Sequence, residues 1–135
     1  MCIRDRVSRL QRDVALKLMA PQAGGLGDWL AEARHVAALN HPHVVPIYEA
    51  DVHELHEGAQ PYLVFEYVSG APLDKHLKAR GPFAPREAVE WLLGVIDALA
   101  HAHAAGLVHR DLKPSNLLVD AAGRARVTDL SLIHI

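Results

Sequence analysis

The sequence predicts an α+β fold from the pattern of its apolar residues and from its composition. Five segments of strand length are rich in β-branched, leucine and aromatic residues, at 12–20, 43–52, 61–68, 117–120 and 125–129. Other segments carry apolar residues at helical spacing. Of the 135 residues, 50% are hydrophobic and 22% are charged, which is typical of a chain that folds around a core. No internal repeat or obvious linker divides the chain, so no second domain is expected.

The strand at 12–20 is followed by a helix at 29–40. Asp28 is expected to be the N-cap of this helix, because an aspartate carboxylate accepts hydrogen bonds from the first free backbone N–H groups. Pro42 lies just beyond the helix and ends it, since the residue before a proline is disfavoured in helical conformation.

The runs at 43–52 and 61–68 predict two paired strands joined by a polar loop. The residues SGAP, at 69–72, interrupt this pattern and predict a break. A short helix at 73–80 follows, and Gly81 ends it.

A longer helix begins at Pro85, which suits a first helical turn, and runs to Gly106. We expect it to be the most buried helix, because its apolar residues form one stripe. Strands at 117–120 and 125–129, joined by the turn AAGR, predict a hairpin beyond it. The stripe consists of Val89, Leu92, Leu93, Ile96, Leu99 and Ala100.

Charge and cysteine content limit the partners and the cellular compartment that are expected for this chain. The formal net charge of -2 gives no broad basic field, so neither nucleic acid nor an anionic membrane surface is expected as a partner. The single cysteine, Cys2, excludes an internal disulfide framework and fits a reducing compartment. The chain has no recognisable signal peptide and no apolar stretch long enough for a membrane segment, so we expect it to be cytoplasmic.

Ten histidines raise the alternative of a metal site. No cysteine partner and no H-E-x-x-H motif accompanies them, and two residues at i and i+2 on a helix point to different faces. A histidine metal site is therefore not expected. The close pairs are His41 with His43, His53 with His56, and His101 with His103.

The loop VHRDLKPSN, at 108–116, has an unusual density of ionisable groups. A solvated turn stopped by Pro114 is the structural alternative. Apolar runs on both sides favour a chemical site, because functional loops are usually held by rigid elements. The polar residues of the loop are His109, Arg110, Asp111, Lys113 and Asn116.

These residues resemble the catalytic loop of the protein kinase family, H-R-D-L-x-x-x-N. His109, Arg110, Asp111, Leu112 and Asn116 fill every fixed position of that pattern. The resemblance implies a protein-kinase-like two-lobed fold, ATP as the phosphoryl donor and Mg²⁺ as the metal. It also implies that Asp111 accepts or orients the proton of the attacking hydroxyl and that Asn116 holds a Mg²⁺ ion.

The letters LKPSN resemble the serine/threonine branch of the family. In that branch the lysine corresponding to Lys113 neutralises the transferring phosphoryl group, which lowers the cost of the charge that develops there. The resemblance gives His109 a structural role within the loop. It makes Arg110 similar to the arginine of kinases that are switched on by phosphorylation of the activation loop.

The letters VALK, at 14–17, are similar to the strand motif whose lysine binds the α- and β-phosphates, although an isolated strand lysine is usually only solvated. By this resemblance Lys17 binds the nucleotide phosphates and Glu32, on the following helix, pairs with Lys17. Ala15 and Leu118 would enclose the adenine ring.

The letters FEYV, at 65–68, resemble the hinge between kinase lobes. Phe65 would guard the back of the nucleotide pocket, and the main chain of Glu66 and Val68 would hydrogen-bond adenine. The alternative is an ordinary edge strand. Asp129 falls where the metal-binding aspartate of the D-F-G motif belongs, but Leu-Ser follows it in place of Phe-Gly.

The two ends of the chain offer an explanation for that departure. LSLIHI can be encoded by CTGTCTCTTATACACAT plus one base, and MCIRDR by ATGTGTATAAGAGACAG plus one base. These strings are reverse complements and are similar to a transposase mosaic end used to build sequencing libraries. Residues 1–6 and 130–135 are therefore interpreted as adapter translation.

The resemblance covers residues 7–129 as a partial kinase domain, with 7–68 as part of the N-lobe and hinge and 69–129 as part of the C-lobe. The glycine-rich loop, the activation segment and the later helices fall outside it. We therefore expect no measurable kinase activity from this chain alone. We also expect the helix at 86–105 to expose an apolar face.

The parent is interpreted as a serine/threonine protein kinase, similar to bacterial members, that phosphorylates a protein hydroxyl. One alternative is a pseudokinase that serves as a nucleotide-binding regulatory module, although Lys17, Asp111 and Asp129 are all present. Another is a small-molecule phosphotransferase of related fold, although those enzymes lack the full HRDLKPSN.

Overall fold

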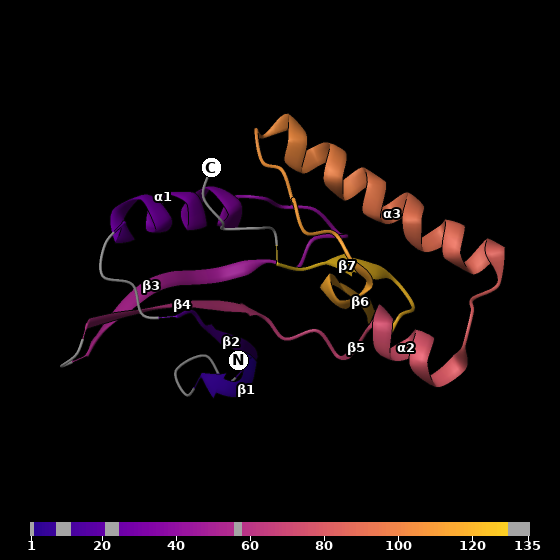
Figure 1. Cartoon of the computed structure of the whole chain (residues 1–135), viewed down its shortest axis with the longest axis horizontal. Coiled ribbons are helices and arrows are strands. Elements are labelled where there is room, and N and C mark those ends of the chain that lie inside the picture. The colour runs from indigo at the N-terminus through magenta and orange to yellow at the C-terminus, as the bar shows by residue number, and fades with distance from the viewer. Residues whose placement is uncertain (1, 8–11, 21–24, 56–57, 130–135) are drawn as a thin grey trace. The chain divides into compact units, whose positions relative to one another are not determined.

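The structure is a computed structural model that describes residues 2–7, 12–20, 25–55 and 58–129 (Figure 1). The α+β fold class is confirmed. The chain forms two compact units. Unit 1 contains the described residues of Met1–Ala38 and Pro46–Tyr67, and unit 2 contains Leu39–Val45 and the described residues of Val68–Ser131.

Unit 1 is built on a four-stranded antiparallel sheet with the order β1-β2-β4-β3. Its strands are β1, Cys2–Val7; β2, Arg12–Leu18; β3, Ile47–Leu55; and β4, Gly58–Glu66. The strands expected at 12–20 and 61–68 are confirmed. The expected strand at 43–52 begins later, at Ile47. The residues just before Pro46 belong to unit 2, where their backbones hydrogen-bond to Val127.

Strand β1 pairs with β2 from Cys2 to Val7. Residues 1–6, predicted to lie apart from the fold, contribute to this strand, because a strand uses main-chain N–H and C=O groups, which almost any sequence offers. The adapter origin of these residues stays a prediction. Residues 130–135, which include the Leu-Ser that follows Asp129, lie outside the described residues.

Helix α1, Leu26–Ala37, packs against β3. Its buried face contains Trp29, which is 1% exposed, together with Ala33 and Val36. The prediction that Asp28 caps this helix is wrong. Gly25 is the N-cap, in the left-handed conformation at φ 76°, and no side chain caps the helix. Asp28 lies within the first turn, where its charge favours the helix dipole.

Unit 2 contains a three-stranded antiparallel sheet with the order β5-β6-β7. Strands β6, Leu117–Asp120, and β7, Ala125–Val127, form the expected hairpin. Strand β5, Gly70–Pro72, replaces the break that was expected at 69–72. Gly70 permits this pairing, because a Cβ atom there would collide with the backbone oxygen of Val119. A strand this short leaves no alternating pattern in the sequence.

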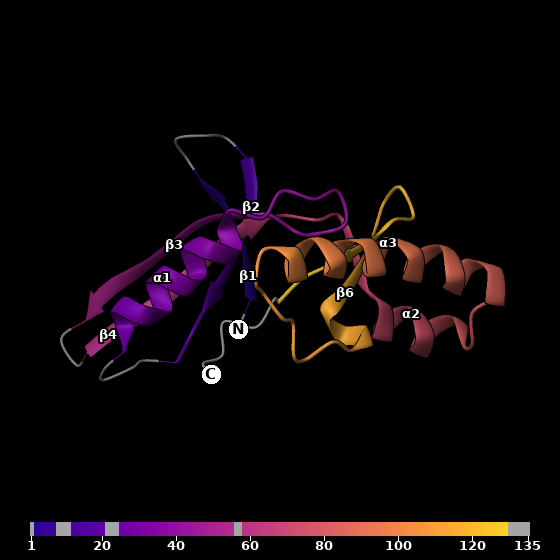
Figure 2. The same ribbon diagram turned by 90° about the horizontal axis from the view of Figure 1, so that it is seen from above.

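Two helices and one helical turn complete unit 2: α2, Leu73–Arg80; α3, Pro85–Ala104; and the 3₁₀ turn η1, Pro114–Asn116 (Figure 2). The helices expected at 73–80 and from Pro85 are confirmed. Helix α3 packs against β7, and α2 packs against η1. Within the part of the chain that the structure describes, no helix has the length and apolar character that crossing a membrane requires.

The expectation that α3 is the most buried helix is wrong. Its buried face consists of small residues and one valine: Gly94, Val95, Ala98 and Ala102. The stripe of large residues faces outward, with Val89 54%, Leu92 50%, Leu93 61% and Ile96 59% exposed. The expected exposed apolar face on this helix is confirmed. Small residues on the buried face allow the helix backbone to pack closely against β7.

The segment 39–45, expected with the first part of the chain, belongs to unit 2. Val45 N donates to Val127 O at 2.9 Å, and Val127 N donates to His43 O at 2.7 Å. The side chains of Val44 and Val45 are buried. The segment therefore adds backbone hydrogen bonds to strand β7, which leads directly to Asp129.

Candidate active site

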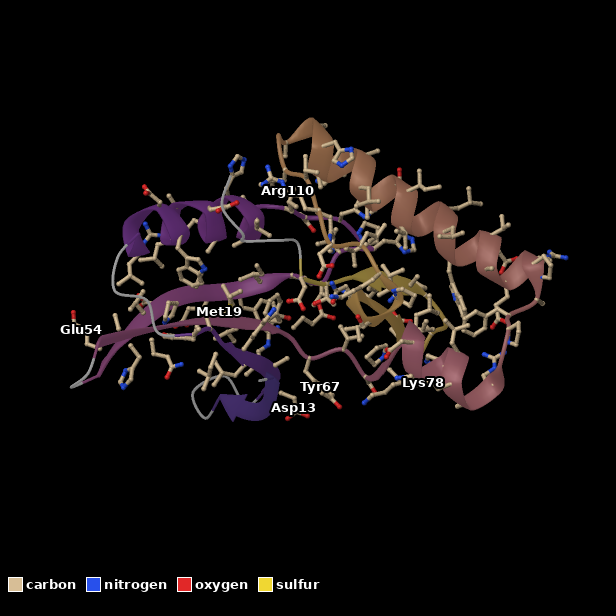
Figure 3. All side chains as sticks on the ribbon, in the orientation of Figure 1. Asp13, Met19, Glu54, Tyr67, Lys78 and Arg110 are labelled. Atoms are coloured by element: carbon tan, nitrogen blue, oxygen red, sulfur yellow. The ribbon has the colours of Figure 1, made fainter. Side chains whose placement is uncertain are left out.

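The loop between α3 and η1 carries the residues of the kinase-like motif, and its backbone makes a tight turn. Asp111 N donates to His109 O at 2.8 Å, and Arg110 between them has φ 60°. Left-handed conformation at a residue with a side chain costs about 1–2 kcal/mol and is typical of functional turns. Arg110 is exposed on this loop (Figure 3).

His109 fixes the loop from inside. His109 is 2% exposed, and its Nε2 lies 3.0 Å from Thr128 O. Because a carbonyl oxygen only accepts, Nε2 carries the proton and donates. Nδ1 then accepts from the backbone N–H of Asp111 at 3.3 Å. This geometry agrees with the structural role that the resemblance implies for His109.

Asp111 forms a polar cluster with Lys113 and Asn116. Lys113 Nζ lies 2.8 Å from Asp111 Oδ2. Asn116 Nδ2 donates to Asp111 O at 2.9 Å and to Asp111 Oδ2 at 3.3 Å. The hydrogen bond from Lys113 is the largest cause that holds the pKa of Asp111 below its usual range, and Asn116 contributes in the same direction. Asp111 is therefore a carboxylate at neutral pH.

The backbone of Thr128 connects Asn116 to Asp129. Thr128 N donates to Asn116 O at 3.0 Å, and Asp129 follows immediately with φ 55°. Asn116 is 7% exposed and directs Nδ2 at Asp111, which leaves its oxygen, Oδ1, as the acceptor of the side chain. An amide oxygen and a carboxylate are hard oxygen donors of the kind that Mg²⁺ prefers. Among the described residues, no group of three or more His, Cys, Asp or Glu side chains could hold a metal.

The remaining predicted site residues of unit 1 lie on its sheet and helix. Ala15 and Lys17 are on β2, opposite Phe65 and Leu63 of β4. Phe65 is buried. Glu66 ends β4, and its backbone N–H donates to Pro46 O at 3.0 Å.

Glu32 is half-buried on α1. Its pairing with Lys17 stays a prediction. Val68 begins the part of unit 2 that follows Tyr67, and Leu118 lies on β6 opposite Pro72 and Arg126. The roles proposed for Val68 and Leu118 toward adenine also stay predictions.

The structure thus brings Asp111, Lys113 and Asn116 into direct contact. It also identifies Thr128, which the sequence did not single out. The two backbone groups of Thr128 bond to His109 and to Asn116, so this residue ties both ends of the loop to the strand that leads to Asp129. Only its position before Asp129 could have drawn attention to Thr128, because a role played by the main chain leaves no mark on residue type.

Known proteins with similar sequences support the kinase resemblance of this loop. The chain is 38% identical over 128 residues to the serine/threonine-protein kinase PknB of Mycobacterium leprae. It is 35% identical over 127 residues to the serine/threonine-protein kinase PrkC of Bacillus subtilis. These alignments include 92% and 91% of this chain but only 21% and 19% of the relatives, so the chain spans about a fifth of their length.

A solved structure is also similar: that of Rad53 1-466 in complex with AMP-PNP. It matches with a TM-score of 0.78 and 28% sequence identity, over 90% of this chain and 32% of Rad53. The family model described as "Protein kinase domain" matches residues 4–134. With the catalytic-loop geometry above, this match over most of the chain shows that the protein belongs to the protein kinase domain family.

Proposed function

We propose that this chain carries the catalytic loop and part of the nucleotide site of a serine/threonine protein kinase, which transfers the γ-phosphoryl group of ATP to a protein hydroxyl. The observation that carries the proposal is the cluster of Asp111, Lys113 and Asn116 on a loop tied to the residue before Asp129. Phosphoryl transfer relies on positioning and charge neutralisation, which are the two things that this cluster supplies.

Asp111 is the group that receives the incoming alcohol. Its carboxylate is ionised at neutral pH because Lys113 and Asn116 hold its pKa low. A low pKa makes a weak base, so Asp111 orients the hydroxyl and accepts its proton only as the oxygen–phosphorus bond forms. The bond from Asn116 Nδ2 to the carbonyl of Asp111 keeps the loop closed around this carboxylate.

Lys113 supplies positive charge beside Asp111. Its ammonium group is half-exposed, with 52% of the side chain accessible, so it can reach both Asp111 and a phosphoryl oxygen nearby. A preorganised cation at that position favours the charge distribution of the transition state over that of the ground state.

Asn116 and Asp129 are proposed to hold Mg²⁺ through the amide oxygen and the carboxylate. The metal would supply charge neutralisation for the nucleotide phosphates. The hydrogen bond that Thr128 N donates to Asn116 O links the backbones that carry these two side chains, which limits their separate movement.

The nucleotide-binding part of the proposal rests on the family resemblance of the residues concerned. Lys17 would bind the α- and β-phosphates and pair with Glu32, and the AMP-PNP bound to the similar Rad53 supports ATP as the nucleotide. A protein hydroxyl is proposed as the acceptor because the relatives named above are serine/threonine-protein kinases, and a cytoplasmic location is proposed with it. Adenine would contact Ala15, Glu66, Val68 and Leu118.

Serine/threonine specificity rests on the loop residues and on the relatives. Lys113 lies within LKPSN, and the relatives named above are serine/threonine-protein kinases. The particular protein substrate would be chosen by surfaces outside this loop, since the cluster recognises only the hydroxyl that reacts.

The test is a graft, because the chain spans about a fifth of its relatives. Residues 7–129 replace the aligned segment of the Mycobacterium leprae PknB, and transfer of labelled phosphate from Mg·ATP to a protein substrate is measured. Asp111→Asn is expected to lower the rate by about 100-fold or more, and Lys113→Met by a comparable factor. The matched control is Asp74→Asn, an acid on α2 in a surface pair with Lys78, expected to stay within about twofold.

A folded graft that binds nucleotide without transferring phosphate would overturn the proposal in favour of a nucleotide-binding regulatory module. Activity that is indifferent to Asp111→Asn would overturn the role given to that carboxylate. The 135-residue chain is assayed alongside. We expect no Mg²⁺-dependent turnover from it alone.

A further inference from the structure

Strand β7 is the last strand in the three-stranded sheet of unit 2, and the segment Leu39–Val45 covers its outer edge. Val127 forms a parallel bridge with Val44. The backbone N–H of Val127 donates to His43 O at 2.7 Å, and Val127 O accepts from Val45 N at 2.9 Å. Both backbone groups of Val127 are therefore bonded to this segment.

The ring of His43 continues this row of hydrogen bonds toward the start of β7. Successive residues of a strand direct their backbone groups to opposite edges, so the carbonyl of Ala125 points to the same edge as that of Val127. His43 Nδ1 lies 2.7 Å from Ala125 O, and it donates because a carbonyl oxygen only accepts. Ala125 is 1% exposed, so water is a poor substitute for this donor.

Packing on α3 fixes the direction of the His43 ring. A Cβ atom at Gly94 would lie 2.5 Å from Nδ1 and Cε1 of this ring, which is closer than van der Waals contact allows. Glycine at this position of α3 therefore gives the ring its place. The backbone N–H of His43 donates to Nδ1 of His41 at 3.1 Å. Because the ring and the main chain of His43 are both held, the ring N–H is preorganised toward Ala125.

The backbone of Asp129, two residues beyond β7, depends on the support of its neighbours. Asp129 has φ 55°, in the left-handed region that is unfavourable for a residue with a side chain. Such a conformation persists only where the surrounding structure over-determines it. Thr128 contributes two of these restraints, because its N–H donates to Asn116 O and its carbonyl accepts from His109 Nε2. The bonds of Val127 to the segment Leu39–Val45 contribute two more.

We infer that His43 is a positioning residue for Asp129: its ring N–H secures the outer edge of β7 and thereby holds Asp129 in its left-handed backbone conformation. His43 bonds to both ends of this three-residue strand, through its ring at Ala125 and through its carbonyl at Val127. Loss of the ring bond loosens the residue whose carbonyl receives the Val127 N–H. The unfavourable conformation of Asp129 then has less to oppose its relaxation.

The consequence for catalysis rests on the proposed function, in which Asn116 and Asp129 hold Mg²⁺. If the left-handed conformation of Asp129 is populated only part of the time, the apparent affinity for the metal falls by that fraction. Asp111 and Lys113 contact each other within the catalytic loop, so their arrangement does not depend on His43. The inference therefore predicts a weaker dependence on metal without a matching loss of rate at saturating metal.

The first test measures the three-bond coupling between the amide and α protons of Asp129, which reports φ, in the ¹⁵N-labelled 135-residue chain. His43→Phe keeps a ring beside Gly94 but has no N–H donor. We expect it to change this coupling and to lower the exchange protection of the Val127 amide about two- to tenfold, the factor that one net hydrogen bond represents. His43→Asn keeps a side-chain N–H donor and should leave both readouts near those of the unsubstituted chain.

Two further variants separate the ring bond from other effects. Gly94→Ala displaces the ring without changing His43, so it should change both readouts in the same direction as His43→Phe. Trp91→Phe is the matched control, because it removes the ring N–H that donates to Gly123 O at 2.9 Å, in the turn of the same hairpin. That turn lies at the end of the hairpin remote from Asp129, so both readouts should stay unchanged.

The second test measures the Mg²⁺ dependence of phosphate transfer in the graft of residues 7–129 into PknB, at constant ATP. His43→Phe should raise the Mg²⁺ concentration that gives half the maximal rate about two- to tenfold. The rate at saturating Mg²⁺ should stay within about twofold, and His43→Asn should restore the Mg²⁺ dependence. A general loss of folded protein would instead lower the rate equally at every Mg²⁺ concentration.

An Asp129 coupling that is the same in His43→Phe, Gly94→Ala and the unsubstituted chain would overturn the inference. Equal changes in His43→Phe and His43→Asn would also overturn it, because the ring N–H would then not be the group that matters. The NMR readouts require no activity. A graft that transfers no phosphate, with the expected couplings, therefore counts against the proposed function alone, and an active graft with unchanged couplings counts against the role of His43 alone.

Discussion

The segment Leu39–Val45, which we call the docking loop, and the catalytic loop are each closed by the same kind of hydrogen bond. In each, a histidine Nδ1 accepts the backbone N–H two residues later, from His43 to His41 and from Asp111 to His109. Each loop also bonds to the segment formed by β7 and Thr128: His43 bonds to Ala125 O, and His109 bonds to Thr128 O. The segment before Asp129 is therefore held from both loops.

The two histidines differ in what their Nε2 atoms face. His109 faces a neutral carbonyl and is 2% exposed, whereas His41 faces a carboxylate that is 74% exposed. The comparison teaches that the same histidine turn can bond to a part-buried carbonyl or to an exposed carboxylate, according to the group that another segment places beyond it.

The largest effect that separates the two loops is expected from His109→Ala. This change removes the part-buried hydrogen bond to the carbonyl of Thr128 and opens a cavity in place of the buried His109 ring, so the free energy of unfolding should fall by about 2–4 kcal/mol. Urea unfolding of the 135-residue chain at neutral pH measures it. His41→Ala is the matched comparison and should cost about 1 kcal/mol. Equal losses would show that burial does not distinguish the loops.

Gly94→Ala tests the packing of the docking loop on α3. A Cβ at Gly94 would lie 2.5 Å from Nδ1 and Cε1 of the His43 ring, so the ring must move and lose its bond to Ala125 O. We expect a net loss of about 1–2 kcal/mol, although alanine favours a helix by about 1 kcal/mol over glycine.

Gly27→Ala on α1 is the control for helix propensity, because a Cβ there meets nothing within 4 Å among the described residues. It should leave stability unchanged or raise it slightly. Stabilisation by both substitutions, measured by urea unfolding, would contradict the close packing of His43 on α3.

Lys113→Met tests the electrostatics of the catalytic loop. Because Lys113 is the largest cause of the lowered pKa of Asp111, that pKa should rise toward its ordinary value. A lowered folded-state pKa stabilises the folded chain above the unfolded-state pKa, and this contribution disappears as pH falls through the folded-state value. NMR titration of the Asp111 carboxyl carbon in acid measures the shift. Lys78→Met, beside Asp74, is the control and should leave the pKa of Asp111 unchanged.

The smallest effect is expected from Asp97→Asn. The amide oxygen can still accept from His41 Nε2, and the site is exposed, so the free energy of unfolding at neutral pH should change by less than about 0.5 kcal/mol. Urea unfolding at neutral pH measures this change. A loss of more than about 1 kcal/mol would contradict the description of this pair as a solvated one.

Much of the local structure could be predicted from the sequence. Three predictions are confirmed: the strand at 12–20, the helix from Pro85 and the hairpin at 117–129. Each of these segments has a strong hydrophobic periodicity or clear turn residues. Strand β5 was missed, since three residues hold no period. The Asp28 cap was wrong because Gly25 starts the helix earlier through its backbone conformation.

Some residues of the candidate site could likewise be predicted from the sequence, and others could not. The motif residues Asp111, Lys113 and Asn116 were named from their order in the chain, and the structure brings them into contact. Thr128 and the docking-loop histidines were not assigned these roles. Their importance comes from backbone bonds between segments far apart in sequence, and such bonds leave no signature in either segment alone.

The sequence by itself determined the order of the elements, the polar residues of the catalytic loop and the apolar stripe of α3. Only the tertiary structure decided that this stripe faces outward and that the small residues Gly94, Ala98 and Ala102 pack inward. It likewise decided which histidine faces a carbonyl and which faces a carboxylate. The physical reason is that periodicity and residue type specify what shares a face or a turn, whereas burial and protonation depend on what another segment places against it.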